Sequence, residues 1–293
     1  MYPAKITATT FFTTDGAALP LRRWLPTRPP QAVMLALHGF NDYSMFFDTP
    51  AQFFSAAGIA CYAFDQRGFG RAPQRGYWAG SDTYIDDVSM LLSLLKQQHP
   101  GLPIFLLGES MGGAIALNVA TQTPPAELNG IILAAPAVWA RSTMPWYQTS
   151  LLWTLAHTVP WMRLSGKGLG KLASDNIEML RAMGRDPLII KETRVEAIYG
   201  LADLMDQAYS NAQSVESNTL LLYGEKDEIL PKEPVYAFIE QLLATPTRER
   251  KTVNIYDNSY HILLRDLGAK SVWQDILSWM HKHTGSLSAV AQP

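Results

Sequence analysis

The fold is decided by the stretch PIFLLGESMGG, residues 103–113, which runs directly into AIALNVAT, residues 114–121. Ile104–Leu107 is a short run of large apolar residues, as expected of a buried parallel strand. The small and apolar residues of 114–121 predict a buried helix. Between strand and helix stands a G-x-S-x-G pattern, whose glycines leave room for a sharp turn. The stretch therefore predicts that Ser110 is a nucleophile lifted above the edge of a sheet.

Strand and helix patterns alternate along most of the chain, which predicts an α/β fold with a doubly wound, mostly parallel, eight-stranded sheet. The first two strands are expected to form an antiparallel edge hairpin around Asp15-Gly16. The expected strands are 6–13, 21–25, 32–37, 59–64, 104–107, 130–135, 219–223 and 252–256. The expected helices are 46–57, 84–98, 114–121, 232–243 and 271–282.

The segment 137–217 breaks this alternation, because it contains no β-rich run of useful length. We therefore expect a helical cap over the catalytic edge, inserted after strand 6 between the two parts of the α/β core, 1–136 and 218–284. Residues 285–293 are expected to be a flexible tail.

Four of the eight tryptophans lie in the cap at spacings of seven, seven and eight, although prolines forbid one continuous helix. They are expected to line an apolar tunnel or a membrane-facing rim; the alternative that they only pack the cap onto the core stays open. The candidate substrate-binding residues are Trp139, Trp146, Leu151, Trp153 and Met162.

Composition excludes several other classes of protein. The chain has 293 residues, 47% hydrophobic and 17% charged, with a net charge of −2, which gives no electrostatic footprint for nucleic acid. Its single cysteine, Cys61, can form neither an intrachain disulfide nor a zinc–thiolate cluster. No sustained apolar run opens the chain or approaches the length of a membrane span. We expect a cytoplasmic protein that needs no metal and no cofactor.

A serine hydroxyl is a weak nucleophile until a base takes its proton, and a carboxylate must orient that base. His261 follows the last expected strand and is the candidate base. Asp227, in the loop after the preceding strand, is the candidate acid; Glu225 lies too near the strand end, and Glu228 is expected to face solvent. His38 is expected to brace its loop rather than act as a base.

The developing oxyanion needs two backbone N–H donors. Met111 directly follows the serine, and Phe40 lies in the loop after the strand 32–37, so these two are the candidates. In the neighbouring loop, Asp65 and Arg67 are expected to pair with each other.

Six segments together resemble the monoacylglycerol lipase and lysophospholipase branch of the α/β-hydrolases. They are HGFNDYS (38–44), DQRGFG (65–70), GESMGG (108–113), DPLI (186–189), GEKDEILP (224–231) and YDNSYHILLRD (256–266). The resemblance spans roughly 12–284 and implies the triad and oxyanion donors already named, with the cap as a lipid-chain site. The family loop usually reads R-G-x-G-x-S, whereas Arg71-Ala72-Pro73 stands here, and the cap matches only loosely apart from DPLI.

The expected activity is hydrolysis of carboxylic esters of medium- to long-chain acyl groups through an acyl-enzyme. The expected partner is a small lipid-like ester, with the cap as a candidate surface for peripheral membrane contact. Two alternatives stay open. A proline-iminopeptidase-type peptidase would need acidic groups for a free amino terminus, and 139–170 contains no Asp or Glu. A ligand sensor without turnover could keep all three triad residues.

Overall fold

One nine-stranded sheet forms the centre of the molecule. The computed structural model describes residues 2–122, 128–166, 168 and 170–284. The strand order is β1-β2-β3-β5-β4-β6-β7-β10-β11, and the strands from β5 to β11 in this order run parallel. The bounds are β1 Lys5–Ile6, β2 Thr10–Phe12, β3 Ala18–Trp24, β4 Ala32–Leu37, β5 Ile59–Phe64, β6 Ile104–Glu109, β7 Gly130–Ala134, β10 Thr219–Gly224 and β11 Lys251–Tyr256. The predicted mostly parallel sheet is confirmed.

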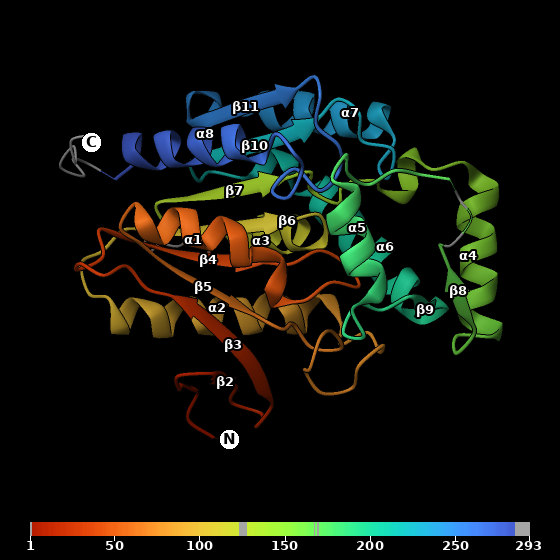
Figure 1. Cartoon of the computed structure of the whole chain (residues 1–293). Helices are drawn as coiled ribbons and strands as arrows, with labels where there is room; N and C mark the ends of the chain where they lie inside the picture. Colours follow the sequence, from red (N-terminus) through yellow and green to blue (C-terminus); the bar gives the residue numbers. More distant parts are fainter. Residues whose placement is uncertain (1, 123–127, 167, 169, 285–293) are drawn as a thin grey trace.

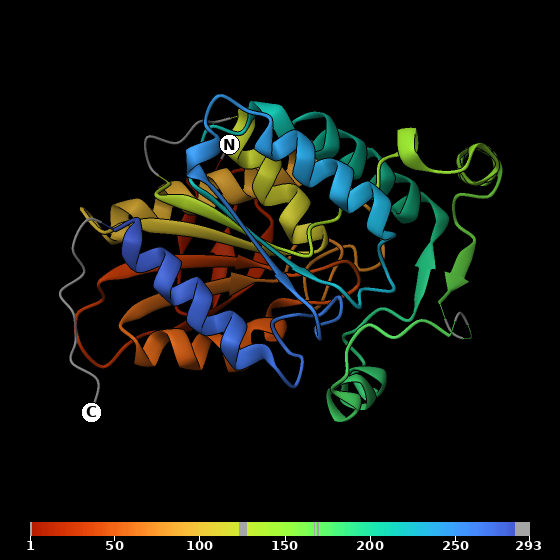
Figure 2. The ribbon, with the colours of Figure 1, turned by 90° about the horizontal axis from the view of Figure 1, so that it is seen from above.

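Helices cover both faces of the sheet, so the fold is doubly wound (Figures 1 and 2). Helices α1 (Asp48–Ala56) and α8 (Ala269–Lys282) lie on one face, and α2 (Ser81–Gln98), α3 (Met111–Gln122) and α7 (Lys232–Leu243) lie on the other. Because both faces are covered, all residues of β4, β5, β6, β7 and β10 are buried. Alternate residues of these strands therefore belong to two separate apolar cores.

The sheet has nine strands instead of the predicted eight, because the first expected strand, 6–13, is two short strands. The chain reverses between β1 and β2, which pair with each other antiparallel. The Thr7 hydroxyl donates to the Thr10 carbonyl, and the Thr7 backbone N–H donates to the same oxygen at 2.8 Å. These local bonds replace the continuous strand that was expected over 6–13. The expected hairpin around Asp15-Gly16 is formed by β2 and β3.

The segment predicted to be a helical cap lies beyond the carboxyl ends of the parallel strands (Figure 1). It contains α4 (Trp146–Thr158), α5 (Ile177–Arg185) and α6 (Val195–Ser210). The cap is mainly helical, as predicted, but it also contains β8 (Arg163–Ser165) and β9 (Glu192–Arg194), which form a small antiparallel sheet. Three residues each are too few to give a β signal in sequence. Helix α6 also packs on α3 of the core. The predicted tail, 285–293, lies outside the described residues.

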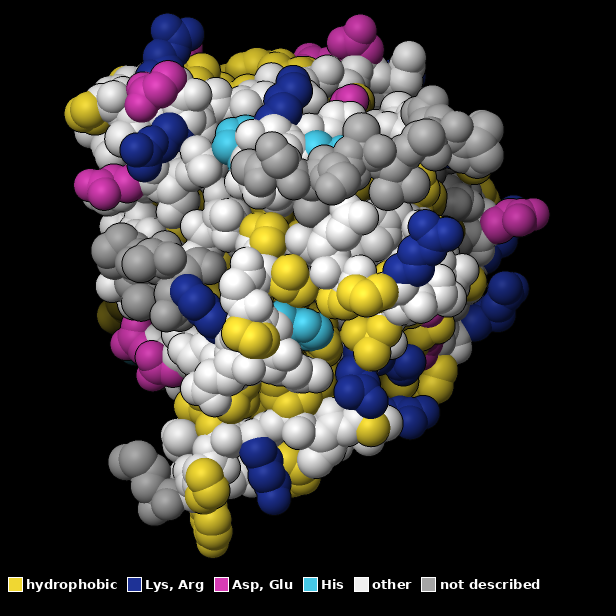
Figure 3. Space-filling model, turned by 90° about the vertical axis from the view of Figure 1, so that its left-hand side faces the viewer, with side chains coloured by type: hydrophobic (Ala, Val, Ile, Leu, Met, Phe, Trp, Pro, Cys, Tyr) yellow, Lys and Arg dark blue, Asp and Glu magenta, His cyan; other side chains and the backbone are white. Residues whose placement is uncertain are grey.

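Short 3₁₀ turns occur at Ser44–Phe47, Arg141–Thr143, Ala212–Ser214 and Arg248–Arg250. In the described ranges, no helix is both long and apolar enough to cross a bilayer. The face turned away from the cap carries side chains of both charges scattered among apolar and neutral ones (Figure 3).

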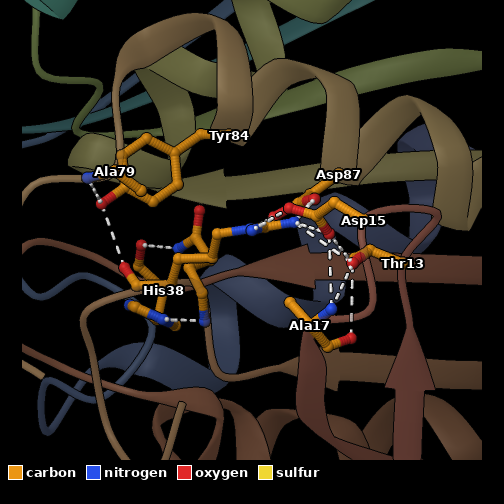
Figure 4. A network of polar contacts seen from close by, with 9 residues as sticks. Thr13, Asp15, Ala17, His38, Ala79, Tyr84 and Asp87 are labelled. Atoms are coloured by element: carbon orange, nitrogen blue, oxygen red, sulfur yellow. Dashed lines mark hydrogen bonds and ion pairs between the residues drawn. The ribbon is translucent and has the colours of Figure 1, made fainter. Parts of the chain in front are cut away.

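The predicted pairing of Arg67 with Asp65 is wrong. Its guanidinium bridges Asp87 of α2 and Asp15 of the hairpin, each at 2.7 Å, and Asp15 and Asp87 converge in Figure 4. The Asp65 carboxylate instead accepts backbone N–H groups of Ser44 (3.0 Å) and Arg71 (2.8 Å). Arg67 therefore ties the hairpin to α2, while Asp65 closes its own loop.

Candidate active site

Ser110 lies at the sharp turn between β6 and α3. Its φ of 54° is in the left-handed region, which is strained for a residue with a side chain. A Cβ at Gly108 would collide with the Gly112 carbonyl, and a Cβ at Gly112 would collide with the Leu37 carbonyl. The glycines therefore permit the close approach that lifts Ser110 above the sheet edge, as the sequence indicated.

The loops after β10 and β11 bring an aspartate and a histidine to Ser110. His261 Nε2 lies 3.0 Å from Ser110 Oγ, and His261 Nδ1 lies 2.7 Å from Asp227 Oδ2. The other oxygen of Asp227 accepts the backbone N–H groups of Ile229 (2.7 Å) and Leu230 (3.0 Å), which fixes the carboxylate. A carboxylate only accepts, so Nδ1 carries the proton and Nε2 is free to accept the serine hydroxyl.

The surroundings of His261 favour its charged form. Burial lowers the pKa of His261, but the charge and hydrogen bond of Asp227 raise it, as do the charges of Glu109 and Asp266. The net shift of the His261 pKa is upward from its ordinary 6.5. The site can therefore stabilise the imidazolium that forms when the serine gives up its proton.

The residues that the sequence analysis considered and set aside as catalytic acid or base bind other partners. Glu225 binds Lys232 at 2.7 Å and Tyr236 at 2.6 Å, and Glu228 accepts the backbone N–H of Leu172 at 2.7 Å. His38 Nδ1 donates to the Gly39 carbonyl at 2.8 Å, and its Nε2 accepts the backbone N–H of Gln66. Burial lowers the pKa of His38, so it is a neutral histidine that braces its loop.

The loop that contains Phe40 packs directly on the nucleophile. A Cβ added at Gly39 would lie 3.3 Å from Ser110 Cβ, which is a tight contact, so a larger residue would push the two segments slightly apart. The Phe40 ring packs edge-on against Phe69. Met111 is the first residue of α3, where backbone N–H groups have no partner within the helix. Met111 thus follows Ser110 directly in the chain, and Phe40 follows the glycine that packs on Ser110.

Ser110 and His261 open into an apolar cavity of about 570 Å³. Its walls come from the segment before α4, from α4 itself, from α6 and from the loop that carries Asp227. The apolar side chains that line it include Trp139, Met144, Leu152, Ile198, Leu201 and Met205. Among the described lining residues, none is Asp or Glu.

Of the five predicted cap residues, the structure brings only Trp139 to this cavity. Trp146 is 77% exposed, Leu151 60% and Trp153 56%, and Met162 does not line it either. The seven-residue spacing does place Trp146 and Trp153 on one side of α4, but that side faces outward. The inner side carries Gln148 and Leu152, which are four residues apart.

The α6 side of the cavity was missed from sequence. Ile198, Leu201 and Met205 all lie on this helix and line the cavity. Their spacing of three and four is the apolar pattern of one helical face, which is the signal that could have found them.

A parallel sheet with a serine at a strand–turn–helix, and an aspartate and a histidine on later loops, defines an α/β-hydrolase. A family model described as Serine aminopeptidase, S33 matches residues 28–268, and the chain belongs to that family.

Known proteins resemble the chain over most of its length. It is 27% identical to the Homo sapiens monoglyceride lipase over 289 residues, 95% of this chain and 92% of the relative. It is 26% identical to the Mycolicibacterium smegmatis monoacylglycerol lipase over 265 residues, 89% of this chain and 91% of the relative. The crystal structure of a soluble variant of the Saccharomyces cerevisiae monoglyceride lipase, in complex with a substrate analogue, superimposes with a TM-score of 0.78 at 24% identity; the match covers 97% of this chain and 99% of that one.

These relatives agree with the predicted class. The chain is a carboxylic ester hydrolase of the monoacylglycerol lipase-like kind.

Proposed function

We propose that the chain hydrolyses esters of medium- to long-chain acyl groups, such as monoacylglycerols or lysophospholipids, through an acyl-enzyme on Ser110. One observation carries the proposal: the hydrogen-bonded series Ser110–His261–Asp227 opens into a cavity with apolar walls. The names of the relatives support a glyceride-like substrate.

In the first half of the reaction, Ser110 Oγ attacks the ester carbonyl carbon while His261 Nε2 takes the hydroxyl proton. The carbonyl oxygen becomes an oxyanion, to which the backbone N–H groups of Phe40 and Met111 donate. Each such donor is worth about 2.7–4 kcal/mol in comparable sites. His261 then gives its proton to the departing alcohol, which leaves an acyl group on the serine.

In the second half, water attacks the acyl carbon while His261 accepts one of its protons. The second tetrahedral oxyanion occupies the same backbone donors. It collapses to the free acid as His261 returns the proton to Ser110 Oγ. Asp227 stabilises the imidazolium in both halves and keeps the tautomer that points Nε2 at the serine.

The walls of the cavity support a long acyl group over a short one. Each buried methylene contributes roughly 0.8 kcal/mol at best, so about ten carbons could supply several kcal/mol after ordering costs. A glycerol head offers only a few hydrogen bonds of about 1 kcal/mol each. Most of the binding energy would therefore come from the acyl chain.

A peptidase, which the family description names, is less well supported. A free amino terminus is a cation, and it needs an anionic or strongly polar acceptor to replace water. The described lining residues include neither Asp nor Glu. A sensor that binds the ester without turnover would be distinguished from an enzyme by a negligible rate of ester hydrolysis.

An acyl-chain series tests the proposal. We expect kcat/KM for p-nitrophenyl decanoate to exceed that for the acetate by about 10²-fold, which is roughly half of the full methylene contribution. Ser110→Ala should abolish hydrolysis, while Ser278→Ala, at an exposed position of α8, should retain it. Faster turnover of the acetate would contradict the apolar-chain site. Binding with negligible turnover would favour the sensor, and cleavage of alanine p-nitroanilide alone would favour the peptidase.

We also propose that the outer side of α4 contacts the membrane from which such a substrate comes. Trp146 and Trp153, which share that side, are both more than half exposed, as are Tyr147 and Leu151 on adjoining parts of the helix, and Trp161 follows just beyond it. Two exposed tryptophans on one side of a helix, with further exposed apolar residues beside them, are typical of surfaces that enter the lipid interface.

A further inference from the structure

The buried side chain of Arg265 links three segments of the candidate site. These are the nucleophile turn at Ser110, the oxyanion loop that contains Phe40, and the histidine loop that contains His261 and Arg265 itself. Arg265 lies in the loop after β11, four residues beyond His261. Its Nη2 lies 2.7 Å from Asp42 Oδ2 and 3.0 Å from Glu109 Oε1. The side chains of all three residues are nearly inaccessible, with exposed fractions of 12%, 7% and 3%.

Each acidic residue that Arg265 contacts lies close in sequence to a residue of the candidate catalytic site. Glu109 ends β6 and directly precedes Ser110. Asp42 lies two residues after Phe40, and its backbone N–H closes a turn onto the Gly39 carbonyl at 3.3 Å. Arg265 itself closes the histidine loop, because its backbone N–H donates to the Ile262 carbonyl at 3.0 Å.

Few other groups hold these carboxylates. Asp42 Oδ1 accepts the backbone N–H of Tyr43, and no described residue donates to Glu109 Oε2. Burial raises the pKa of Glu109, which the charge of Arg265 opposes. Without the guanidinium, both carboxylates would be buried with no cationic partner among the described contacts, and the two ion pairs that join these segments would be lost.

We propose that Arg265 is a positioning residue, which holds the nucleophile turn, the oxyanion loop and the histidine loop at the separations that ester hydrolysis requires. This proposal rests on the proposed function of the same site. Arg265 touches none of the reacting atoms; it acts through Glu109 on Ser110, through Asp42 on Phe40, and through its own loop on His261.

The chain offers a matched control in Arg67. This arginine also bridges two carboxylates, Asp15 and Asp87, and its side chain is 16% exposed. It joins the hairpin to α2, and the described hydrogen bonds of its side chain go to Thr13, Asp15 and Asp87, none of which lies in the three loops. Figure 4 shows these three partners side by side. Loss of either guanidinium should lower stability, but only loss of Arg265 should disturb the reacting groups.

The test compares Arg265→Met, Arg265→Lys and Arg67→Met at equal folded fraction, measured by circular dichroism. We expect Arg265→Met to lower kcat for p-nitrophenyl decanoate by about 10²-fold, as misplacement of a reacting group by about 1 Å does. KM should change less than about twofold, because the apolar cavity is untouched. The kcat of Arg265→Lys should be about tenfold higher than that of Arg265→Met. Both carboxylates contact a single nitrogen of Arg265, and the lysine ammonium can replace that nitrogen.

Wild-type-like kcat in Arg265→Met, or an equal loss of kcat in Arg67→Met, would overturn the proposal. Should Arg265→Met fail to fold, Arg265→Lys and Glu109→Gln decide: a drop in kcat at constant KM supports positioning, and wild-type kcat in both overturns it. The rate of labelling by a fluorophosphonate separates two failures. A wild type that does not react at Ser110 removes the proposed function, whereas variants that react as fast as a reactive wild type remove only the role of Arg265.

Discussion

His261 must be neutral at Nε2 to take the proton of Ser110, so its titration should set the acid limb of the activity profile. Burial lowers the pKa of His261, but Asp227, Glu109 and Asp266 raise it, and the net shift is upward from 6.5. A raised pKa means that the base becomes protonated, and activity is lost, at a higher pH than for a free imidazole.

We therefore expect the acid-limb midpoint of kcat/KM to lie above about 6.5. The measurement is a pH series with a neutral soluble ester such as p-nitrophenyl butyrate. Glu225→Gln serves as a control, because Glu225 binds Lys232 and Tyr236, and it should leave the midpoint unchanged. Activity that stays flat down to about pH 4 would contradict His261 as the base.

At the scale of the element, helix α4 presents two different surfaces. Leu152 and Gln148 face the cavity, while Trp146 and Trp153 face outward. Substrate binding and membrane contact should therefore be separable by mutations on the two sides of the same helix.

For the outer side, we expect Trp146→Ser/Trp153→Ser to reduce co-sedimentation with phosphatidylcholine vesicles by at least tenfold. Burial of one such large side chain contributes about 1.5–3 kcal/mol, and two should be close to additive. Hydrolysis of soluble p-nitrophenyl butyrate should not change. Leu25→Ser, at a half-exposed position at the end of β3, is the matched control and should leave vesicle binding unchanged. Equal sedimentation of all three proteins would disprove the membrane contact.

The sequence predicted the elements that have long apolar runs or a clear motif. The strand–turn–helix around Ser110 and the late positions of Asp227 and His261 were all predictable, because parallel strands deliver their following loops to one edge. The side of α4 that faces inward was not predictable. A seven-residue spacing shows that Trp146 and Trp153 share a side, but only the packing of α4 against α6 decides which side is covered.

Short elements and ion pairs were also beyond sequence. Strands β8 and β9 have three residues each, and the reversal at Thr7 depends on local hydrogen bonds between Thr7 and Thr10. Arg67 was expected to pair with Asp65 two residues away, yet it pairs with Asp15 and Asp87 from other elements. Partners at large sequence separation follow from the fold, and charge alone does not identify them.

At the scale of the whole molecule, the sheet brings together groups that are far apart in the chain. The contact between Ser110 and His261 spans 151 residues, and that between His261 and Asp227 spans 34. Each lies on a loop at the carboxyl edge of the parallel strands, beyond which the cap lies (Figure 1). Cap residues line the apolar cavity into which Ser110 and His261 open. The chemistry therefore depends on the complete sheet.

The most direct measurement is the site and rate of covalent labelling by a long-chain fluorophosphonate, followed by mass spectrometry of the digested protein. We expect one adduct, on Ser110, formed with loss of fluoride. Its rate of formation should fall by about 10³-fold or more in His261→Ala, because the hydroxyl then has no base. An adduct on a different residue, or unchanged labelling of Ser110 in His261→Ala, would contradict the account.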